Sequence, residues 1–316
     1  MELVKHQAMQ ISVLGEGMLE MSRRDRRDDR WQLGFGGDTL NTAIHLARFG
    51  LPVAYVSALG NDPFSTALRE EWAAEGLNVD HVLADPDHLP GLYAIRTDAQ
   101  GERSFFYWRN DSAARHLLAL PGIDAALAYA AGADLFYLSL ISLAILSEDA
   151  RARVYDLCAE IRQHGGRVAF DSNYRPALWD RPKSARAVAC KMAALCDIGL
   201  PTLSDERLLF GSRDPDSVAD RWHSYGTAEI AVKLGASGCL LSAAGRRRMV
   251  PAIADIDPVD TSGAGDAFNG GYLAARMRGL DAATACRMGH QLAGWVITRT
   301  GALPKRTAEA PYAPGV

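Results

Sequence analysis

Two carboxylates frame a turn of small residues at positions 260–266, which read D-T-S-G-A-G-D. Apolar or small residues then recur at helical spacing, so we predict that a helix begins in this turn. The first N–H groups of a helix have no partner within it, and the helix dipole adds positive potential, which suits phosphate oxygens. Gly263 and Gly265 would let such a ligand approach the backbone closely.

Asp266 stands at the start of the same helix, where its negative charge would repel a phosphate. One explanation is that it caps the helix, a position that aspartate favours. The other is that it acts as a general base, accepting the proton of a hydroxyl group that attacks a phosphoryl group. The two roles are compatible, and the local pattern leaves both open.

A second turn, G-F-G-G-D-T-L-N at positions 34–41, also opens a predicted helix. Its three glycines permit a sharp turn, after which Asp38 and Asn41 lie in the first helical turn. The asparagine amide can both donate and accept hydrogen bonds, which suits a polyhydroxylated ligand. The alternative is a helix capped by Asp38 that binds no ligand.

Predicted strands and helices alternate along most of the chain, and these elements must position the two turns. Strands are predicted at 10–14, 53–58, 135–140, 167–170, 197–200, 229–234 and, before the aspartate-rich turn, 252–256. Helices are predicted at 39–49, 64–75, 123–131, 148–164, 183–195 and 217–225. This rhythm predicts an α/β fold whose mostly parallel central sheet is covered by helices on both faces. Sites in such sheets lie at the carboxyl ends of the strands.

Four further strands fall outside this rhythm, and we expect them to form a small second sheet that projects as a lid, built from about 16–36 and 91–110. The second pair reads as a hairpin around residues 98–101. The mixed-charge run 23–30 is interpreted as a solvated loop at the tip of the lid. We therefore expect one α/β domain over 1–304, followed by a loosely ordered tail at 305–316.

Composition excludes several classes of protein. The chain has 316 residues, 34 Lys+Arg against 38 Asp+Glu, and 48% apolar residues, so we expect a folded protein that binds no nucleic acid. It has no apolar run long enough for a membrane span. Five scattered cysteines and no secretory signal favour a cytoplasmic location. We find no P-loop, no complete dinucleotide fingerprint and no short histidine or cysteine motif for zinc.

Taken together, the two turns resemble the two signatures of the ribokinase-like (PfkB) family of carbohydrate kinases, in the family's order and separation. Within it, the chain is most similar to the 2-keto-3-deoxygluconate kinases, through G-E-G-M-L-E-M, L-P-G-L-Y, F-F-Y-W-R-N and D-S-N-Y-R-P-A-L-W. This resemblance implies a three-layer α/β/α domain with a β-sheet lid. It also implies phosphoryl transfer from ATP, with Mg²⁺, to the 6-hydroxyl of 2-dehydro-3-deoxy-D-gluconate.

The resemblance also implies roles for individual residues. Asp266 would be the catalytic base, and the backbone N–H groups of Gly263, Ala264 and Gly265 would form an anion hole. The residues that would hold the sugar acid are Gly37, Asp38, Asn41, Tyr93, Tyr107, Arg109 and Arg175. Those that would surround ATP are Asn173, Tyr174, Arg175, Lys233, Gly235, Ala236, Ser237, Gly238 and the 263–265 turn.

Arg109 and Arg175 are consistent with a substrate that carries a carboxylate, because their planar guanidinium groups can pair with a carboxylate or a phosphate. The sequence departs from the family at T-L-S-D-E (202–206), where Leu203 replaces an asparagine. Glu206 could orient water bound to Mg²⁺, or could be a charge at a helix start. A monovalent cation and a homo-oligomer that covers the apolar lid are further expectations.

Three rival functions remain open at this stage. The chain could phosphorylate a neutral sugar, as a fructokinase does. It could bind a sugar as a regulator without catalysis, although the intact 263–266 turn argues against this. A dehydrogenase on a similar sheet would need the dinucleotide fingerprint, which Gly15–Glu16–Gly17 lacks.

Overall fold

A computed structural model describes residues 9–23, 30–97 and 103–312. Its central sheet has ten strands in the order β14-β13-β12-β11-β10-β9-β1-β4-β5, and β6 also pairs with β4. From β12 to β5 the neighbouring strands run parallel, whereas β13 and β14 are antiparallel. The strands are β1 (Ile11–Leu14), β4 (Val53–Leu59), β5 (Leu77–Asn78), β6 (Val82–Ala84), β9 (Leu135–Ser139), β10 (Arg167–Asp171), β11 (Ile198–Gly199), β12 (Glu229–Lys233), β13 (Cys239–Ala243) and β14 (Arg246–Val250).

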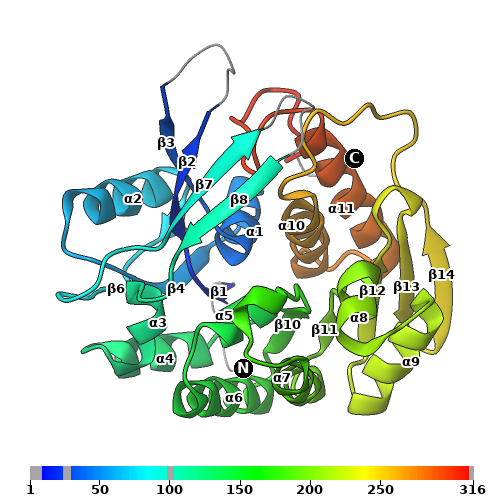
Figure 1. Ribbon diagram of the computed structural model, residues 1–316. Coiled ribbons are helices and arrows are strands. Elements are labelled where there is room, and N and C mark those ends of the chain that lie inside the picture. Colours follow the sequence, from blue (N-terminus) through cyan, green and yellow to red (C-terminus); the bar gives the residue numbers. More distant parts are fainter. Residues whose placement is uncertain (1–8, 24–29, 98–102, 313–316) are drawn as a thin grey trace, which may run out of the picture.

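Helices cover both faces of this sheet (Figure 1). One face packs against α1 (Asp38–Arg48), α2 (Pro63–Ala74), α10 (Ala264–Met277) and α11 (Ala282–Ile297). The other packs against α3 (Ala113–His116), α4 (Ile123–Ala131), α5 (Leu140–Ala144), α6 (Glu148–Gln163), α7 (Pro182–Ala194), α8 (Leu203–Phe210) and α9 (Pro215–Tyr225). Three short 3-10 helices lie at Leu117–Ala119, Pro176–Leu178 and Gly235–Ser237.

The strands are apolar on both faces because each face has its own core. Phe136 and Leu138 of β9 lie in the core beneath α6, while Leu135 and Tyr137 of the same strand lie in the core beneath α1 and α10. Successive side chains of a strand point to opposite faces, so one apolar strand can serve both layers. The predicted three-layer α/β/α arrangement is confirmed.

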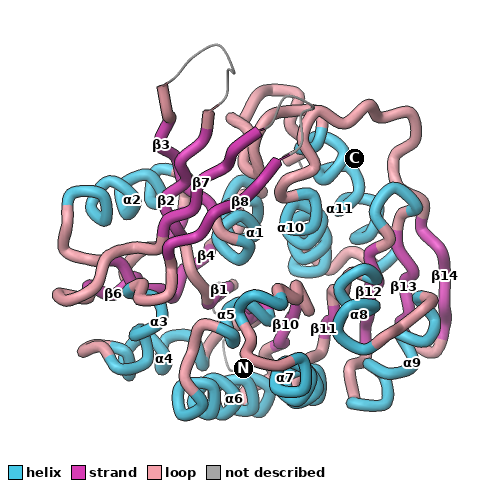
Figure 2. The backbone as a smooth tube through the Cα atoms, in the orientation of Figure 1, coloured by secondary structure: helices cyan, strands magenta, loops and turns pink. Residues whose placement is uncertain are grey.

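The lid is a separate four-stranded sheet that projects from the main body (Figure 2). Its order is β3-β2-β7-β8, with β2 (Met18–Ser22) parallel to β7 (Leu92–Thr97) and with β3 (Gln32–Gly36) and β8 (Arg103–Trp108) antiparallel to their neighbours. Met18, Tyr93 and Ile95 form a small buried cluster within the lid. The lid predicted from the sequence is present, although the 98–101 turn and most of the 23–30 run lie outside the described residues.

Two sequence predictions about local structure are wrong. Residues 252–256 form a loop rather than a strand, and the antiparallel pair β13–β14 precedes them. The tail predicted to be loosely ordered is instead packed against the protein at residue 312. Tyr312 is buried, and its hydroxyl lies 2.8 Å from Nδ1 of His45. Its ring also packs edge-on against Phe49, so the chain end closes over α1. Among the described residues, no helix is long and apolar enough to cross a membrane.

Candidate functional site

A cavity of about 870 Å³ lies between the lid and the carboxyl ends of the central strands. Both predicted turns line it: Gly37, Asp38 and Asn41 from the start of α1, and residues 261–266 from the start of α10. Gly37 is required there because its φ is +155° and an added Cβ would lie 2.3 Å from the Glu16 carbonyl oxygen. The turns are more than 200 residues apart in the sequence, and the packing of α1 against α10 brings them together.

The 260–266 turn is held rigidly. Asp260 accepts hydrogen bonds from the backbone N–H groups of Ser262 (3.0 Å) and Gly301 (2.5 Å). Gly263 adopts φ +70°, and a Cβ there would lie 2.6 Å from Cβ of Ala302. Of the three amides expected to form an anion hole, that of Ala264 already donates a long bond, 3.3 Å, to the Thr261 carbonyl. The N-terminus of α10 thus faces the cavity with a fixed backbone and no side chain at Gly263 or Gly265.

Asp266 is partly buried and lines this cavity, and Nδ2 of Asn41 donates a 2.8 Å hydrogen bond to its carboxylate. Burial, followed by the negative charge of Asp38, raises the pKa of Asp266 to about 7. The bond from Asn41 opposes this shift. A carboxyl group with such a pKa can take up a proton near neutral pH, which is what a general base requires.

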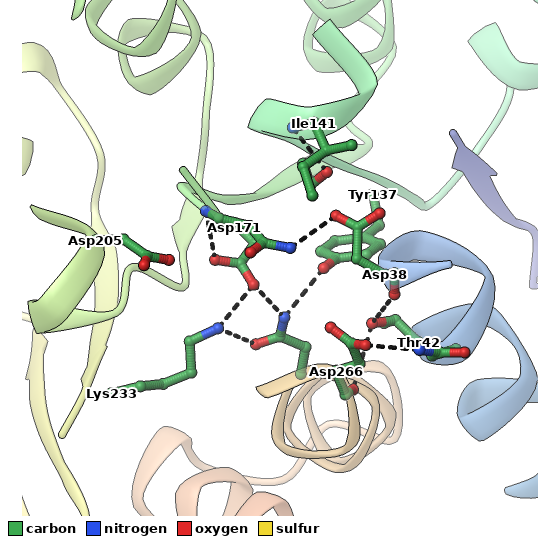
Figure 3. Close-up of polar contacts among 12 residues, drawn as sticks. Asp38, Thr42, Tyr137, Ile141, Asp171, Asp205, Lys233 and Asp266 are labelled. Carbon is green, nitrogen blue, oxygen red and sulfur yellow. Dashed lines mark hydrogen bonds and ion pairs between the residues drawn. The ribbon is translucent and has the colours of Figure 1, made fainter. Parts of the chain in front are cut away.

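Asp38 lies close by and presents a second carboxylate to the cavity (Figure 3). Its Oδ2 accepts a 2.9 Å hydrogen bond from Nδ2 of Asn173, which follows the end of β10. Thr42 links the two turns further, because its hydroxyl lies within hydrogen-bonding distance of the carbonyls of Asp38 (3.2 Å) and Asp266 (3.3 Å). The expected sugar-binding residues Asp38 and Asn41 therefore surround Asp266.

A buried polar network joins the ends of β10 and β12 to α10 (Figure 3). The Lys233 ammonium donates to Oδ2 of Asp171 at 2.7 Å and to Oδ1 of Asn269 at 3.0 Å. Asn269 donates in turn to Asp171 (2.7 Å) and to the Tyr137 hydroxyl (3.0 Å). A Cβ added at Gly265 would lie 3.7 Å from Nζ of Lys233, so this positive charge sits beside the start of α10.

The two arginines expected to bind the sugar acid differ in how strongly they already pair with carboxylates of the protein. Arg109 is buried and forms an ion pair with the buried Glu16, which Ser112 also binds. The side chain of Arg175 is 51% exposed, and its nearest carboxylate, Asp205, is 3.7 Å away. Both arginines line the cavity. A ligand could bind the guanidinium group of Arg175 without breaking a buried ion pair, whereas binding to Arg109 would leave the buried Glu16 carboxylate unpaired.

The two lid tyrosines also line the cavity. The Tyr93 hydroxyl donates to Glu20, which limits its availability to a ligand. Tyr107 is 51% exposed, and burial of part of its ring raises the pKa of its phenol. Its hydroxyl therefore stays protonated at neutral pH and can donate a hydrogen bond.

At the other end of the cavity, Gly235, Ala236 and Gly238 line the wall as expected for a nucleotide loop, whereas Tyr174 is buried in the core. Ser237 is exposed on the same loop. The sequence analysis missed an apolar wall from the 252–258 loop and α11, whose only sequence signal is the apolar character of these segments: Ala252, Ile253, Ile256, Pro258, Ala293, Gly294 and Ile297.

Glu206 does not reach the cavity. It is 1% exposed and accepts hydrogen bonds from Arg221 and from Nε1 of Trp222 (3.1 Å). Asp205, its neighbour, lines the cavity instead, and burial raises the pKa of its carboxyl group while Arg175 opposes the rise. The metal role expected of Glu206 is therefore not supported by its position.

Comparison with known proteins decides the family. The sequence model that describes the pfkB family of carbohydrate kinases matches residues 9–308 of this chain. The chain belongs to this family.

Its relatives include a Dickeya dadantii protein named 2-dehydro-3-deoxygluconokinase, which is 44% identical over 300 residues, covering 93% of this chain and 96% of that protein. The crystal structure of 2-dehydro-3-deoxygluconokinase from Thermotoga maritima has the same fold, with a TM-score of 0.83, 22% identity and 95% of each chain covered. A fructokinase from Vibrio cholerae, solved with fructose, ADP and a calcium ion, gives a TM-score of 0.80 at 23% identity over 93% and 94% of the chains. As a pfkB carbohydrate kinase, this chain therefore has a fold that holds a sugar and a nucleotide in related proteins.

Proposed function

We propose that this protein transfers the γ-phosphoryl group of ATP to the 6-hydroxyl of 2-dehydro-3-deoxy-D-gluconate, giving the 6-phosphate and ADP. The observation that carries the proposal is the position of Asp266, a carboxyl group of raised pKa at the N-terminus of α10 and in contact with Asn41. The 44% identical relative of that name favours this sugar acid.

In this mechanism the sugar acid binds beneath the lid with its terminal hydroxyl at Asp266. The carboxylate accepts the hydroxyl proton while the oxygen forms a bond to the γ-phosphorus and the bond to the β–γ bridging oxygen breaks. ADP leaves with the electron pair of that bond. The amides of the 263–265 turn and Lys233 face the phosphoryl group and offset its charge.

Mg²⁺ is part of the proposal, because it neutralises phosphate charge in reactions of this type. The donors present fit a magnesium ion that keeps most of its waters and the nucleotide oxygens. Asp205 is one of the cavity-lining carboxylates and is proposed to hold such a water, whereas Glu206 is already paired with Arg221.

Arg175 is proposed to bind the carboxylate of the sugar acid. Replacing it with glutamine should raise KM for the sugar acid about 10- to 100-fold, because a hydrogen bond to a charged group is worth about 1.5–3 kcal/mol. KM for ATP should change much less. Initial rates with each substrate varied in turn would measure both, with Arg207→Gln as a control on the exposed side of α8. An unchanged KM for the sugar acid would remove this role from Arg175.

The raised pKa of Asp266 predicts the pH dependence of the reaction. A base is active when deprotonated, so kcat/KM should rise about tenfold per pH unit below about 7 and level off above it. The charge of Asp38 contributes to the raised pKa, so Asp38→Asn should move this limb to lower pH. A pH–rate profile of both proteins tests this, and a limb that stays in place would contradict the assigned coupling.

The substrate is tested by detecting ADP release with 2-dehydro-3-deoxygluconate, its galactonate epimer, fructose and ribose side by side. The highest kcat/KM with one of the two sugar acids supports the proposal. A preference for fructose would favour the fructokinase alternative. Absence of ADP release with every sugar would favour a sugar-binding regulator on the same fold.

Three further expectations complete the proposal. We propose activation by a monovalent cation, self-association through the lid and a cytoplasmic location. Self-association is supported by two exposed aromatic side chains of β8, Phe106 and Trp108, at 47% and 62% exposure. Sedimentation of a Trp108→Lys variant would test the interface.

A further inference from the structure

Two arginines line a second cavity, which is separate from the kinase cavity. It has a volume of about 390 Å³ and lies on the face of the sheet that α6 and α7 cover (Figure 1). Arg115 of α3 and Arg151 of α6 both contribute to its wall. Cavities of a few hundred Å³ can hold small molecules. We propose that this cavity binds a phosphate group, either free or as part of a small phosphomonoester.

The guanidinium group of Arg151 is held in place with part of it left available. Its Nε donates a 2.7 Å hydrogen bond to the Leu143 carbonyl, and its Cζ lies 5.1 Å from the centroid of the Trp179 ring. These two contacts orient the plane of the group. Within the described residues, no hydrogen bond or ion pair engages Nη1 or Nη2 of Arg151. These two nitrogens can therefore donate to two oxygens of one phosphate, a geometry that arginine commonly uses.

Arg115 supplies a second positive charge to the same cavity. In the part of the chain that the structure describes, its side chain forms no hydrogen bond or ion pair. Burial, and then the charge of Arg115, lower the pKa of Arg151, while Tyr155 and Glu148 oppose this shift. Arginine side chains remain protonated in proteins, so the two groups repel each other. An anion that binds both groups would offset this repulsion.

The rest of the polar lining consists of two hydroxyl groups and one carboxylate, from Ser147, Ser184 and Asp180. Oγ of Ser147 accepts a 3.2 Å hydrogen bond from the Ala150 amide, so its O–H can still donate to a phosphate oxygen. The Asp180 carboxylate opposes an anion, but this residue is exposed and its charge is hydrated. Two positive charges against one negative charge favour an anionic ligand over a cationic one.

One segment of the chain contributes to both cavities. Arg175 lines the kinase cavity, and the chain reaches Trp179 in the second cavity after the 3-10 helix Pro176–Leu178. A phosphate bound to Arg151 would hold this arginine against Trp179 and so restrain the segment that carries Arg175. We therefore expect phosphate to lower KM for the sugar acid, an expectation that rests on the proposed function of Arg175.

Titration of the full-length protein with inorganic phosphate, followed by phosphorus NMR, tests the site. A non-hydrolysable ATP analogue with Mg²⁺ first fills the phosphate-binding part of the kinase cavity. We expect one saturable site. Arg115→Gln should raise Kd about 10- to 100-fold, the usual loss on removing a hydrogen bond to a charged group. Its fold should be unaffected, because Arg115 has no partner to lose within the described residues.

Two further variants test whether charge at the cavity is the cause. Asp180→Asn should lower Kd for phosphate, because it removes the charge that opposes the anion. Lys183→Gln removes an exposed positive charge next to Ser184 but outside the cavity wall, so its Kd should be unchanged. Glycerol phosphate is titrated in the same way. Tighter binding than that of inorganic phosphate assigns the site to a phosphomonoester, and weaker binding assigns it to free phosphate.

Equal phosphate affinity in the unaltered protein and Arg115→Gln, or no saturable binding to the unaltered protein, would overturn the proposed site. KM for the sugar acid at saturating ATP, measured with and without phosphate, tests the coupling. It should fall in the unaltered protein and in Lys183→Gln, but not in Arg115→Gln. Phosphate binding without a change in KM would overturn the coupling. Absence of kinase activity would count against the proposed function alone, because the titration needs no turnover.

Discussion

Replacing Asp266 with asparagine is expected to lower kcat by about 10²- to 10⁴-fold, the usual contribution of a general base. The change keeps the shape of the side chain and an oxygen that can accept the bond from Asn41, but removes the group proposed to take the hydroxyl proton. Steady-state kinetics with 2-dehydro-3-deoxygluconate and ATP would measure the loss. The dissociation constant for ATP should change little, because the turn proposed to face the phosphates is unaltered.

The stability of the same variant separates a catalytic role from a structural one. The folded-state pKa of Asp266 is raised to about 7, above its unfolded value, so its contribution to stability is present at low pH and is lost as pH rises through about 7. Asp266→Asn should therefore unfold at the same or a higher temperature than the unaltered protein at pH 8. Full turnover in the variant, or a large loss of stability at pH 8, would contradict the assigned role.

The sequence was sufficient for the α/β rhythm because the strands and helices carry strong local patterns. It did not indicate β13 and β14, since β14 begins with three consecutive arginines and shows no apolar alternation. In the turn between them, Ala244 and Gly245 have φ of +51° and +72°. The sequence A-A-G at this position does not by itself predict such a turn. Tyr312 was missed for a different reason, because its partners His45 and Arg48 are more than 260 residues away.

The sequence indicated the candidate-site residues that belong to motifs at helix starts. It did not indicate which side chains face the cavity where a hydrogen-bond partner elsewhere in the chain determines their orientation. Asp205 and Glu206 are adjacent on α8, and successive residues of a helix point about 100° apart, so only one can face the cavity. The sequence analysis left a metal role for Glu206 open, but Arg221 and Trp222 hold this side chain inside the protein. Arg109 lines the cavity, but its pairing with Glu16, 93 residues earlier, could not be inferred from a local pattern.

Lys233→Met is expected to lower the free energy of unfolding by about 3–5 kcal/mol, because removing one partner of a buried ion pair leaves the other charge uncompensated. The side chains of Lys233 and Asp171 are 8% and 4% exposed, and Nζ lies 2.7 Å from the Asp171 carboxylate. Urea unfolding of the two proteins would measure the difference. As a control, Arg247→Met should cost no more than about 1 kcal/mol, because the partners of Arg247 on the surface are 58% and 68% exposed.

The charge of Asp171, rather than lost packing, is the proposed cause of this instability. Adding Asp171→Asn to Lys233→Met should therefore restore about 0.5–3 kcal/mol, the range of coupling between residues in contact. Asn269 could still donate to the new amide oxygen at position 171, so the polar network keeps one of its bonds. If the double variant is no more stable than Lys233→Met, the aliphatic part of Lys233 matters more than its charge. The ion pair would then serve to place a positive charge beside the start of α10, where the phosphoryl group is proposed to bind, without stabilising the fold.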